Sequence, residues 1–188
     1  MKRYSLLISS LLFTLQLIAQ SATTGAIYFP STTQQNRARL YKQMVDTSIR
    51  LSLSDPLSDS TEGEWNEAFW SIELLVYKND FVTKKLRHAW KLADSLSEDF
   101  QKNLIEVAYA VYPIEFKLQA TKLLNATTSI PVFIRCAEYL LQADPLSTTT
   151  RNFIQASINT KFPGNNNPGL VILEIRLTSW NKTQALPP

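Results

Sequence analysis

Hydrophobic residues recur three and four positions apart through residues 65–141, with polar residues between them. This spacing places the hydrophobic residues of each segment on one face of a helix. Five inward faces are expected: Trp65, Phe69, Ile72 and Val76; Val82, Leu86, Ala89, Trp90 and Ala93; Phe100, Leu104, Val107, Ala108 and Val111; Phe116, Ala120, Leu123 and Leu124; and Phe133, Cys136, Ala137, Leu140 and Leu141. The pattern therefore predicts five consecutive helices, each with one buried face.

Glycine and proline positions agree with this pattern. No glycine occurs in residues 64–163, whereas sheet proteins with many turns use glycine often. Pro113, Pro131, Pro145 and Pro163 are predicted to lie at helix starts or ends, where the missing N–H is tolerated. The first and third of these prolines, and the second and fourth, are 32 residues apart. We therefore expect an all-α fold, an array of antiparallel helical hairpins that is HEAT-like, with a degenerate repeat of about 32 residues.

The flanking segments are also predicted to be helical. Residues 36–53 (NRARLYKQMVDTSIRLSL) are typical of a first helix with Leu40, Met44 and Leu51 directed inward, and the polar connection SDPLSDSTEGE follows. Near the other end, PGNNNPG predicts a loop. The hydrophobic residues of 170–179 fit both a strand and a helix, and we favour a helix because the neighbouring segments are helical.

The start of the chain resembles an export signal. MKRYSLLISSLLFTLQLIAQ has a basic start, an apolar run and then small or polar residues, which is the order of a secretory signal peptide. The run is interrupted by polar residues and is shorter than the ~20 apolar residues of a membrane span. We expect a signal peptide at 1–21, an N-terminal helix and polar linker at 22–61, and a helical-repeat domain at 62–188. The mature protein is then secreted or periplasmic, without a membrane span.

The ending ALPP follows directly after the last predicted element. We therefore expect the helical-repeat domain to be truncated at its C-terminus.

Charge and cysteine content limit the partners. The chain has 19 basic and 16 acidic residues, and loss of Lys2 and Arg3 with the leader lowers the formal charge from +3 to +1. Nucleic-acid binding usually needs a clustered basic footprint, so no nucleic-acid partner is expected. Cys136 is the only cysteine, so the chain cannot form an internal disulfide. With one histidine as well, it lacks the ligands of a usual zinc site, and no cofactor is expected.

Catalytic residues do not stand out. Cys136 could act as a nucleophile beside His88, but it falls on an apolar stripe, where cysteine packs as a small hydrophobe. Carboxylate pairs, such as Glu62 with Glu64, can serve sugar hydrolysis, but they also suit helix starts and polar faces. There is no Gly-rich phosphate loop and no serine nucleophile elbow.

One polar helix face is a candidate binding surface. Lys84, Arg87, His88 and Lys91 are spaced three and four apart in KKLRHAWK, so they share one side of a helix. Two interpretations stay open, an anion-binding surface and an ordinary solvated face, because the acidic run SEDF follows soon after.

Seven tryptophans and tyrosines also have two possible roles, as a sugar-binding platform or in helix packing. Packing is favoured. The seven residues are Trp65, Trp70, Tyr77, Trp90, Tyr109, Tyr112 and Tyr139.

Three segments resemble a known arrangement. FQKNLIEVAYAVYPIEFKLQATKLLN, IRCAEYLL and the terminal ALPP are similar to the HEAT-like helical N-terminal region of secreted bacterial proteins that carry a downstream L,D-transpeptidase-like or other cell-envelope enzyme domain. The resemblance covers about residues 60–188 and implies a helical fold. The catalytic part has no counterpart here. AEYLLQADP also resembles the second helix of tetratricopeptide repeats, but their Trp-Leu-Gly first helix is missing.

The expected function follows from these points. We expect a non-catalytic extracytoplasmic helical module for interaction or positioning, with a protein or cell-envelope component as partner. The alternative is a glycan- or peptidoglycan-processing enzyme with a carboxylate site in an all-helical fold, which an aromatic-lined cleft with two facing carboxylates would favour.

Overall fold

The computed structural model describes residues 32–184, with side chains described as far as residue 179, so the predicted signal peptide lies outside the described residues. Regular structure in the described part is helical throughout, which confirms the all-α class. The elements are α2 (Thr32–Ser52), α3 (Glu62–Leu74), α4 (Asp80–Leu92), the 3₁₀ turn η1 (Ala93–Ser95), α5 (Glu98–Val111), α6 (Lys117–Ala126), α7 (Ile130–Ala143), α8 (Thr148–Lys161) and α9 (Pro168–Gln184). Residues 170–179 belong to α9, so the helix favoured for them is confirmed.

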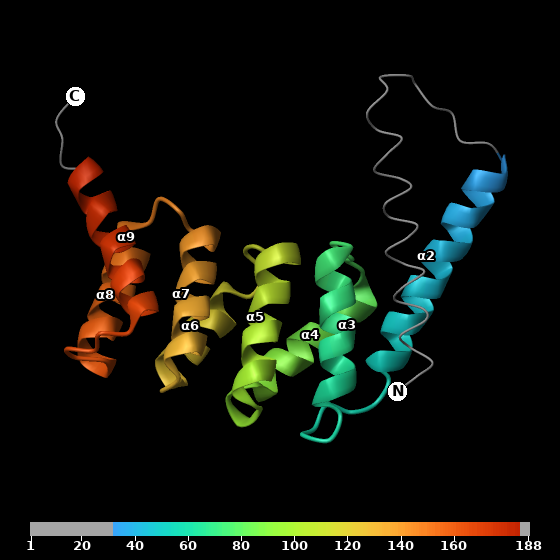
Figure 1. Ribbon diagram of the computed structural model, residues 1–188, viewed down its shortest axis with the longest axis horizontal. Coiled ribbons are helices and arrows are strands. Elements are labelled where there is room, and N and C mark those ends of the chain that lie inside the picture. The colour runs from blue at the N-terminus through green and yellow to red at the C-terminus, as the bar shows by residue number, and fades with distance from the viewer. Residues whose placement is uncertain (1–31, 185–188) are drawn as a thin grey trace. The chain divides into compact units, whose positions relative to one another are not determined.

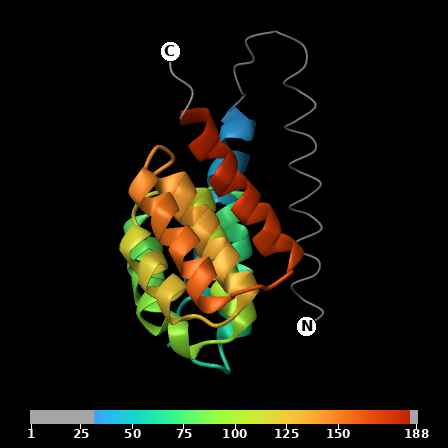
Figure 2. The same ribbon diagram turned by 90° about the vertical axis from the view of Figure 1, so that its left-hand side faces the viewer.

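Alternate helices pack side by side. From Gln43 onward the described residues form one compact unit, in which α3 contacts α5, α5 contacts α7 and α7 contacts α9, so these four helices form a row (Figure 1). Helices α6 and α8 pack against α7, and α4 contacts α5, which gives a second layer beside the row (Figure 2). The helices of the row begin at residues 62, 98, 130 and 168, at intervals of 36, 32 and 38 residues. Residues one helix pair apart in the sequence therefore meet across the row.

The length and hydropathy of a helix decide whether it can cross a lipid bilayer. Among the described helices, none is both long enough and apolar enough to cross a lipid bilayer.

Proline ends three helices where the sequence predicts it. Tyr112, Asp144 and Phe162 are the capping residues at the ends of α5, α7 and α8, and each directly precedes a proline. Proline keeps the preceding residue out of the helical conformation, and these three residues have φ of −131°, −146° and −129°. Pro131 instead lies in the first turn of α7, where its missing N–H has no helical partner to lose.

Serine residues begin two helices of the row and also join them. The Ser97 hydroxyl accepts a hydrogen bond from the backbone of the first turn of α5 and donates one to Glu62, the first residue of α3. The Ser129 hydroxyl caps α7 in the same way and donates to Glu98, the first residue of α5, at 2.7 Å. Each contact satisfies orphan helix donors and binds one helix start to the next.

The predicted inward faces form the core, with two exceptions. Trp65, Phe69 and Ile72 are buried as expected, but Val76 is 62% exposed. Leu141 is only half-buried. The other residues predicted to lie inward in the five segments are buried.

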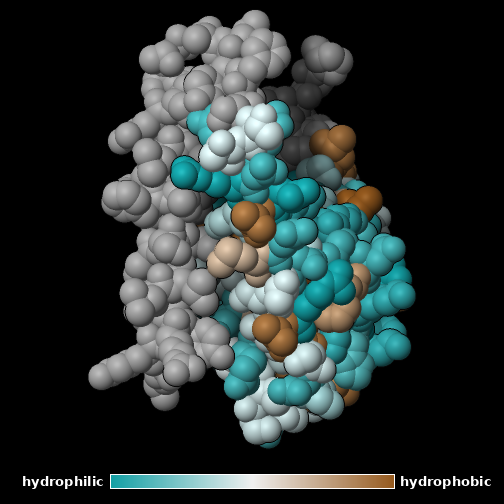
Figure 3. All heavy atoms as spheres, turned by 90° about the vertical axis from the view of Figure 1, so that its right-hand side faces the viewer, coloured by the Kyte–Doolittle hydropathy of each residue, from teal (hydrophilic) through white to brown (hydrophobic). Residues whose placement is uncertain are grey.

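The predicted inward face of the first helix is wrong. Leu40, Met44 and Leu51 are 55%, 57% and 68% exposed, whereas Val45 and Ile49 on the next face of α2 are buried. Both faces are apolar, and periodicity alone does not say which one meets a partner. Figure 3, which faces the right-hand side of Figure 1, shows exposed hydrophobic side chains as separate spots among hydrophilic ones.

Val76 is exposed because the chain reverses its direction at the end of α3. Its backbone N–H donates to Glu73 O at 3.1 Å, and the N–H of Tyr77 donates to Ile72 O at 2.8 Å. These two bonds form a Schellman motif, in which the residue at the Val76 position adopts the left-handed conformation and is usually glycine. Val76 has φ of +47°, which is unfavourable for a β-branched side chain.

Replacing Val76 by glycine is therefore expected to stabilise the protein. Val76→Gly removes the unfavourable Cβ contacts of the left-handed conformation, and it sacrifices little burial because the side chain is exposed. The net gain in the free energy of unfolding should be about 0.5–1 kcal/mol, because the greater freedom of glycine in the unfolded chain offsets part of the relief. Urea denaturation measures it. The control Val76→Ala keeps a Cβ and should gain less; an equal gain from both would contradict the explanation.

A buried tyrosine holds the turn between α5 and α6 against α7. The hydroxyl of Tyr139, which is 0% exposed, donates to Tyr112 O at 2.6 Å and accepts from Phe116 N at 3.0 Å. Burial raises the pKa of Tyr139 to about 12, although the bond from Phe116 opposes this rise. The hydroxyl thus pairs a donor and an acceptor that the helix ends leave without helical partners.

Tyr139→Phe should consequently weaken the fold. Loss of the hydroxyl leaves both backbone groups buried without this partner, which costs about 1–3 kcal/mol. The midpoint of urea denaturation should fall accordingly. Tyr109→Phe is the matched control, because Tyr109 lies on α5 with 47% exposure and its substitution should have little effect. Equal losses in both variants would show that the buried hydroxyl has no special role.

Candidate functional site

The four predicted basic site residues lie together on α4. Lys84, Arg87, His88 and Lys91 are all exposed, and the structure shows no ion pair between any of them and another described residue. Two hollows lie along the row of helices, and none of these four residues lines either of them. The structure thus places a cationic strip on the surface of α4.

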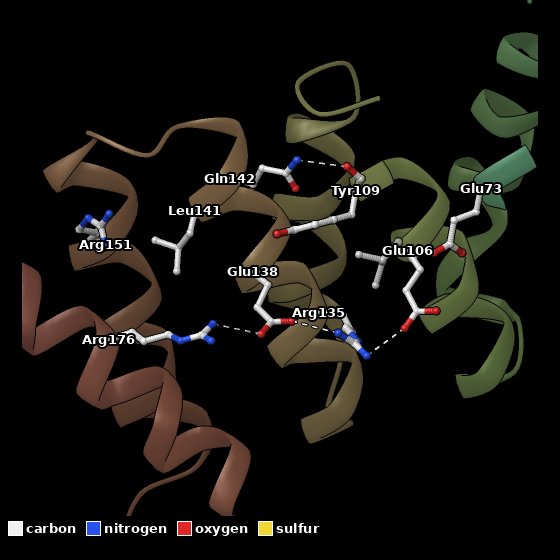
Figure 4. A pocket seen from close by; sticks show the side chains of 10 residues that line it. Glu73, Glu106, Tyr109, Arg135, Glu138, Leu141, Gln142, Arg151 and Arg176 are labelled. Atoms are coloured by element: carbon white, nitrogen blue, oxygen red, sulfur yellow. Dashed lines mark hydrogen bonds and ion pairs between the residues drawn. The ribbon is translucent and has the colours of Figure 1, made fainter. Parts of the chain in front are cut away.

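A larger hollow crosses the row of helices. It measures about 740 Å³ and is lined from α3, α5, α7, α8 and α9 (Figure 4). Tyr109 of α5 and Leu141 of α7 give it apolar surface, and the side chain of Gln142 donates to the backbone carbonyl of Tyr109 at 3.2 Å. Its position explains why Leu141 is only half-buried.

A chain of ion pairs runs through the larger hollow. Arg135 of α7 lies 3.0 Å from Glu106 of α5 and 3.2 Å from Glu138 on its own helix. Glu138 in turn lies 3.4 Å from Arg176 of α9. Figure 4 shows these four side chains following one another from α5 to α9. Because the side chains are substantially exposed, each pair adds no more than about 1 kcal/mol to stability, but together they orient the charged groups of three helices.

A smaller hollow adjoins the larger one. It measures about 110 Å³, is lined from α3 and α5, and shares Glu73 and Glu106 with the larger hollow. Trp70, which is 47% exposed, forms part of its wall. The Asn103 amide donates to Asn66 Oδ1 at 3.1 Å within it. We call the two hollows together the groove.

Glu73 differs electrostatically from the other carboxylates of the groove. Partial burial raises its pKa, the neighbouring Glu106 carboxylate raises it further, and Arg135 opposes both effects. Glu106 and Glu138 have arginine partners, whereas Glu73 forms no ion pair with any residue that the structure describes. Two carboxylates thus lie at the α3 end of the groove, and one of them, Glu106, is turned toward Arg135 (Figure 4).

Cys136 packs in the core, as the apolar stripe predicts. It is 0% exposed, and burial raises the pKa of its thiol well above the usual range. His88, by contrast, is exposed on α4. A thiolate nucleophile paired with this histidine is therefore excluded by position. In the described part of the chain, no three histidine, cysteine or carboxylate side chains gather as a metal site would require.

The groove was not identified from the sequence, although a signal was present. Trp70 and Tyr109 directly follow the inward residues Phe69 and Ala108, so they fall off the buried stripe. Both are exposed and line the groove, while Trp65, Trp90, Tyr112 and Tyr139 are buried. The preference for packing is thus right for most of the aromatic residues and wrong for these two.

Comparison with protein families, with characterised proteins and with solved structures finds no match for this chain.

The raised pKa of Glu73 predicts a pH-dependent effect on stability. A carboxyl whose pKa is higher in the folded state than the ordinary value of 4.5 favours folding when protonated, and this contribution is lost as the pH rises through the folded pKa. Glu73→Gln should therefore raise the thermal midpoint at pH 7. The gain should shrink as the pH falls through the folded pKa of Glu73 and should be absent well below 4.5, where the carboxyl is protonated in both states.

Glu67→Gln, at an exposed residue of the same helix that lines neither hollow, is the control and should change neither value. A variant at Glu73 that melts lower than the parent at pH 7 would show that the ionised carboxylate is stabilising.

Proposed function

We propose that this chain is a non-catalytic binding or positioning module that acts outside the cytoplasm at the cell envelope, with a partner protein held in the groove. The observation that carries the proposal is the groove itself. It crosses helices of one row, it displays two aromatic side chains, and its charged groups are fixed by a chain of ion pairs. Rows of helices offer such extended surfaces for binding.

The proposal includes a HEAT-like array of antiparallel helical hairpins with a degenerate repeat. Two observations support it. The helices of the row start at intervals of 36, 32 and 38 residues. The contact between a glutamate at one helix start and the serine cap of the next occurs twice, with separations of 35 and 31 residues. The same contact at nearly the same separation is what a repeat produces.

Location and partner are proposed from the sequence. The order of charges and apolar residues in 1–21 supports export, and a near-neutral mature chain suits a protein or cell-envelope component better than nucleic acid. The resemblance to helical regions that precede cell-envelope enzyme domains supports a positioning role beside such an enzyme.

One observation favours the enzymatic alternative, in which a carboxylate site processes glycan or peptidoglycan. Glu73 and Glu106 line the groove with Trp70 and Tyr109, and a raised pKa is what a general acid needs. Against it, Glu106 is held by Arg135 at 3.0 Å, and the groove is open to water, which weakens electrostatic catalysis. We therefore place the binding function first.

Site-specific photo-crosslinking tests the proposed function. A photoreactive phenylalanine analogue at Tyr109, in the groove, is expected to crosslink a discrete envelope protein in the native host. The same analogue at Leu118, which is 64% exposed on α6, serves as the control and should not give that product. Equal labelling at both positions contradicts a role for the groove.

Incubation of the purified chain with peptidoglycan fragments, followed by mass spectrometry, should yield no cleavage products. Cleavage that is lost in Glu73→Gln or Glu106→Gln would falsify the non-catalytic proposal and establish the alternative.

The basic strip on α4 gives a separate prediction. Combined Lys84→Glu, Arg87→Glu and Lys91→Glu should change the free energy of unfolding by about 0.5 kcal/mol or less per exposed site. If the strip binds anions, the variant should leave a heparin column at lower salt than the parent, with His88 unchanged in both. Identical elution would identify the strip as an ordinary solvated face.

A further inference from the structure

The two ends of the groove differ in charge. Glu73 and Glu106 lie at the α3 end, whereas Arg151 and Arg176 line the other end, near α8 and α9. The smaller hollow, at the acidic end, is lined by no basic residue. A partner that follows the groove therefore meets carboxylates and an exposed indole at one end.

Trp70 is an aromatic surface without a cation of its own. Elsewhere in the described residues, cationic side chains cover aromatic rings: Arg50 lies 4.7 Å from the ring centre of Phe81, and Lys78 lies 4.6 Å from that of Tyr112. The structure places no such cation over Trp70 within its described part. Indole is the aromatic group that attracts cations most strongly.

Glu73 and Glu106 repel each other when both are ionised. After partial burial, this repulsion is the second cause that raises the pKa of Glu73. A cation placed between Trp70 and these carboxylates would remove the repulsion, so its binding is favoured by more than the new contacts alone.

We propose that the smaller hollow receives an arginine or lysine side chain of a polypeptide partner that lies extended along the groove. This inference rests on the proposed function and adds the chemistry of the partner. Trp70 covers the cationic group and Glu73 pairs with it, while Glu106, which stays bound to Arg135, adds negative charge beside it. The Asn66 and Asn103 amides border the hollow. Tyr109 and Leu141 of the adjoining larger hollow contact the following residues of the partner.

Other occupants fit less well. A calcium ion needs six to eight oxygen ligands, but one of the two carboxylates is already bound to Arg135 and the Asn66 oxygen accepts a bond from Asn103. A free amine would fill the hollow of about 110 Å³ but leave the adjoining hollow of about 740 Å³ unused. A polypeptide side chain uses both.

A peptide titration of the purified full chain tests the inference. The probe is a ten-residue blocked peptide of glycine, serine and alanine with one arginine and one leucine four residues later. Two companion peptides replace the arginine by glutamine or glutamate. Binding is followed by NMR up to millimolar peptide. We expect the arginine peptide to bind about tenfold more tightly than the glutamine peptide, and the glutamate peptide to bind most weakly.

Three variants separate the inference from general effects. Glu73→Gln and Trp70→Leu should each remove most of the tenfold preference for arginine, whereas the control Glu67→Gln should keep it. Since Glu73→Gln is expected to stabilise the fold, its loss of binding would not reflect unfolding. Trp70→Leu keeps an apolar side chain and so tests the indole face itself. The preference should also weaken as salt is raised.

The outcomes distinguish the inference from the proposed function. If all three peptides bind equally, and Tyr109→Ala weakens them, the groove binds polypeptide but the cation site is refuted. If a glycan fragment binds and no peptide does, both the inference and the polypeptide partner are refuted. An arginine preference that survives both Glu73→Gln and Trp70→Leu places the cation elsewhere and also overturns the inference.

Discussion

The buried hydroxyl of Tyr139 is the interaction on which the arrangement of the row most depends. It bonds to Tyr112, which caps the end of α5, and to Phe116, which caps the start of α6, while its own ring belongs to α7. One polar atom in the core therefore fixes the turn of one helix pair against the next helix. The Arg135–Glu106 pair and the wall of the groove lie across the same two helices, α5 and α7.

The groove and the core use the same helices for opposite purposes. Phe69 and Ala108 face inward, and the next residues, Trp70 and Tyr109, face the solvent. A helix turns by about 100° per residue, so a single step along the chain changes a packing residue into a surface residue. The stability of the row and the character of its surface can consequently change almost independently through substitutions on the two faces.

The sequence predicts the helices and their inward faces well, but it does not predict which helices pack against each other. Periodicity gave the inward faces of α4, α5 and α6, and the residues before proline gave helix ends such as Tyr112 and Asp144. The prediction that Val76 lies on the inward face is wrong because a Schellman motif is normally recognised in a sequence by its glycine, and this turn has none. The groove was missed because it depends on α3 meeting α5 rather than α4, and no short-range pattern records which helices become neighbours.

From α3 onward, the main contacts of each helix join it to the next helix in the chain or to the one after that. No helix of the row must wait for the far end of the chain to find its partner. Structure can therefore accumulate from one end, with α3 and α5 packing as soon as residue 111 is available. A chain that emerges amino-terminus first can fold in the order in which it appears, and the apolar faces left unpaired at any moment belong to its newest two helices.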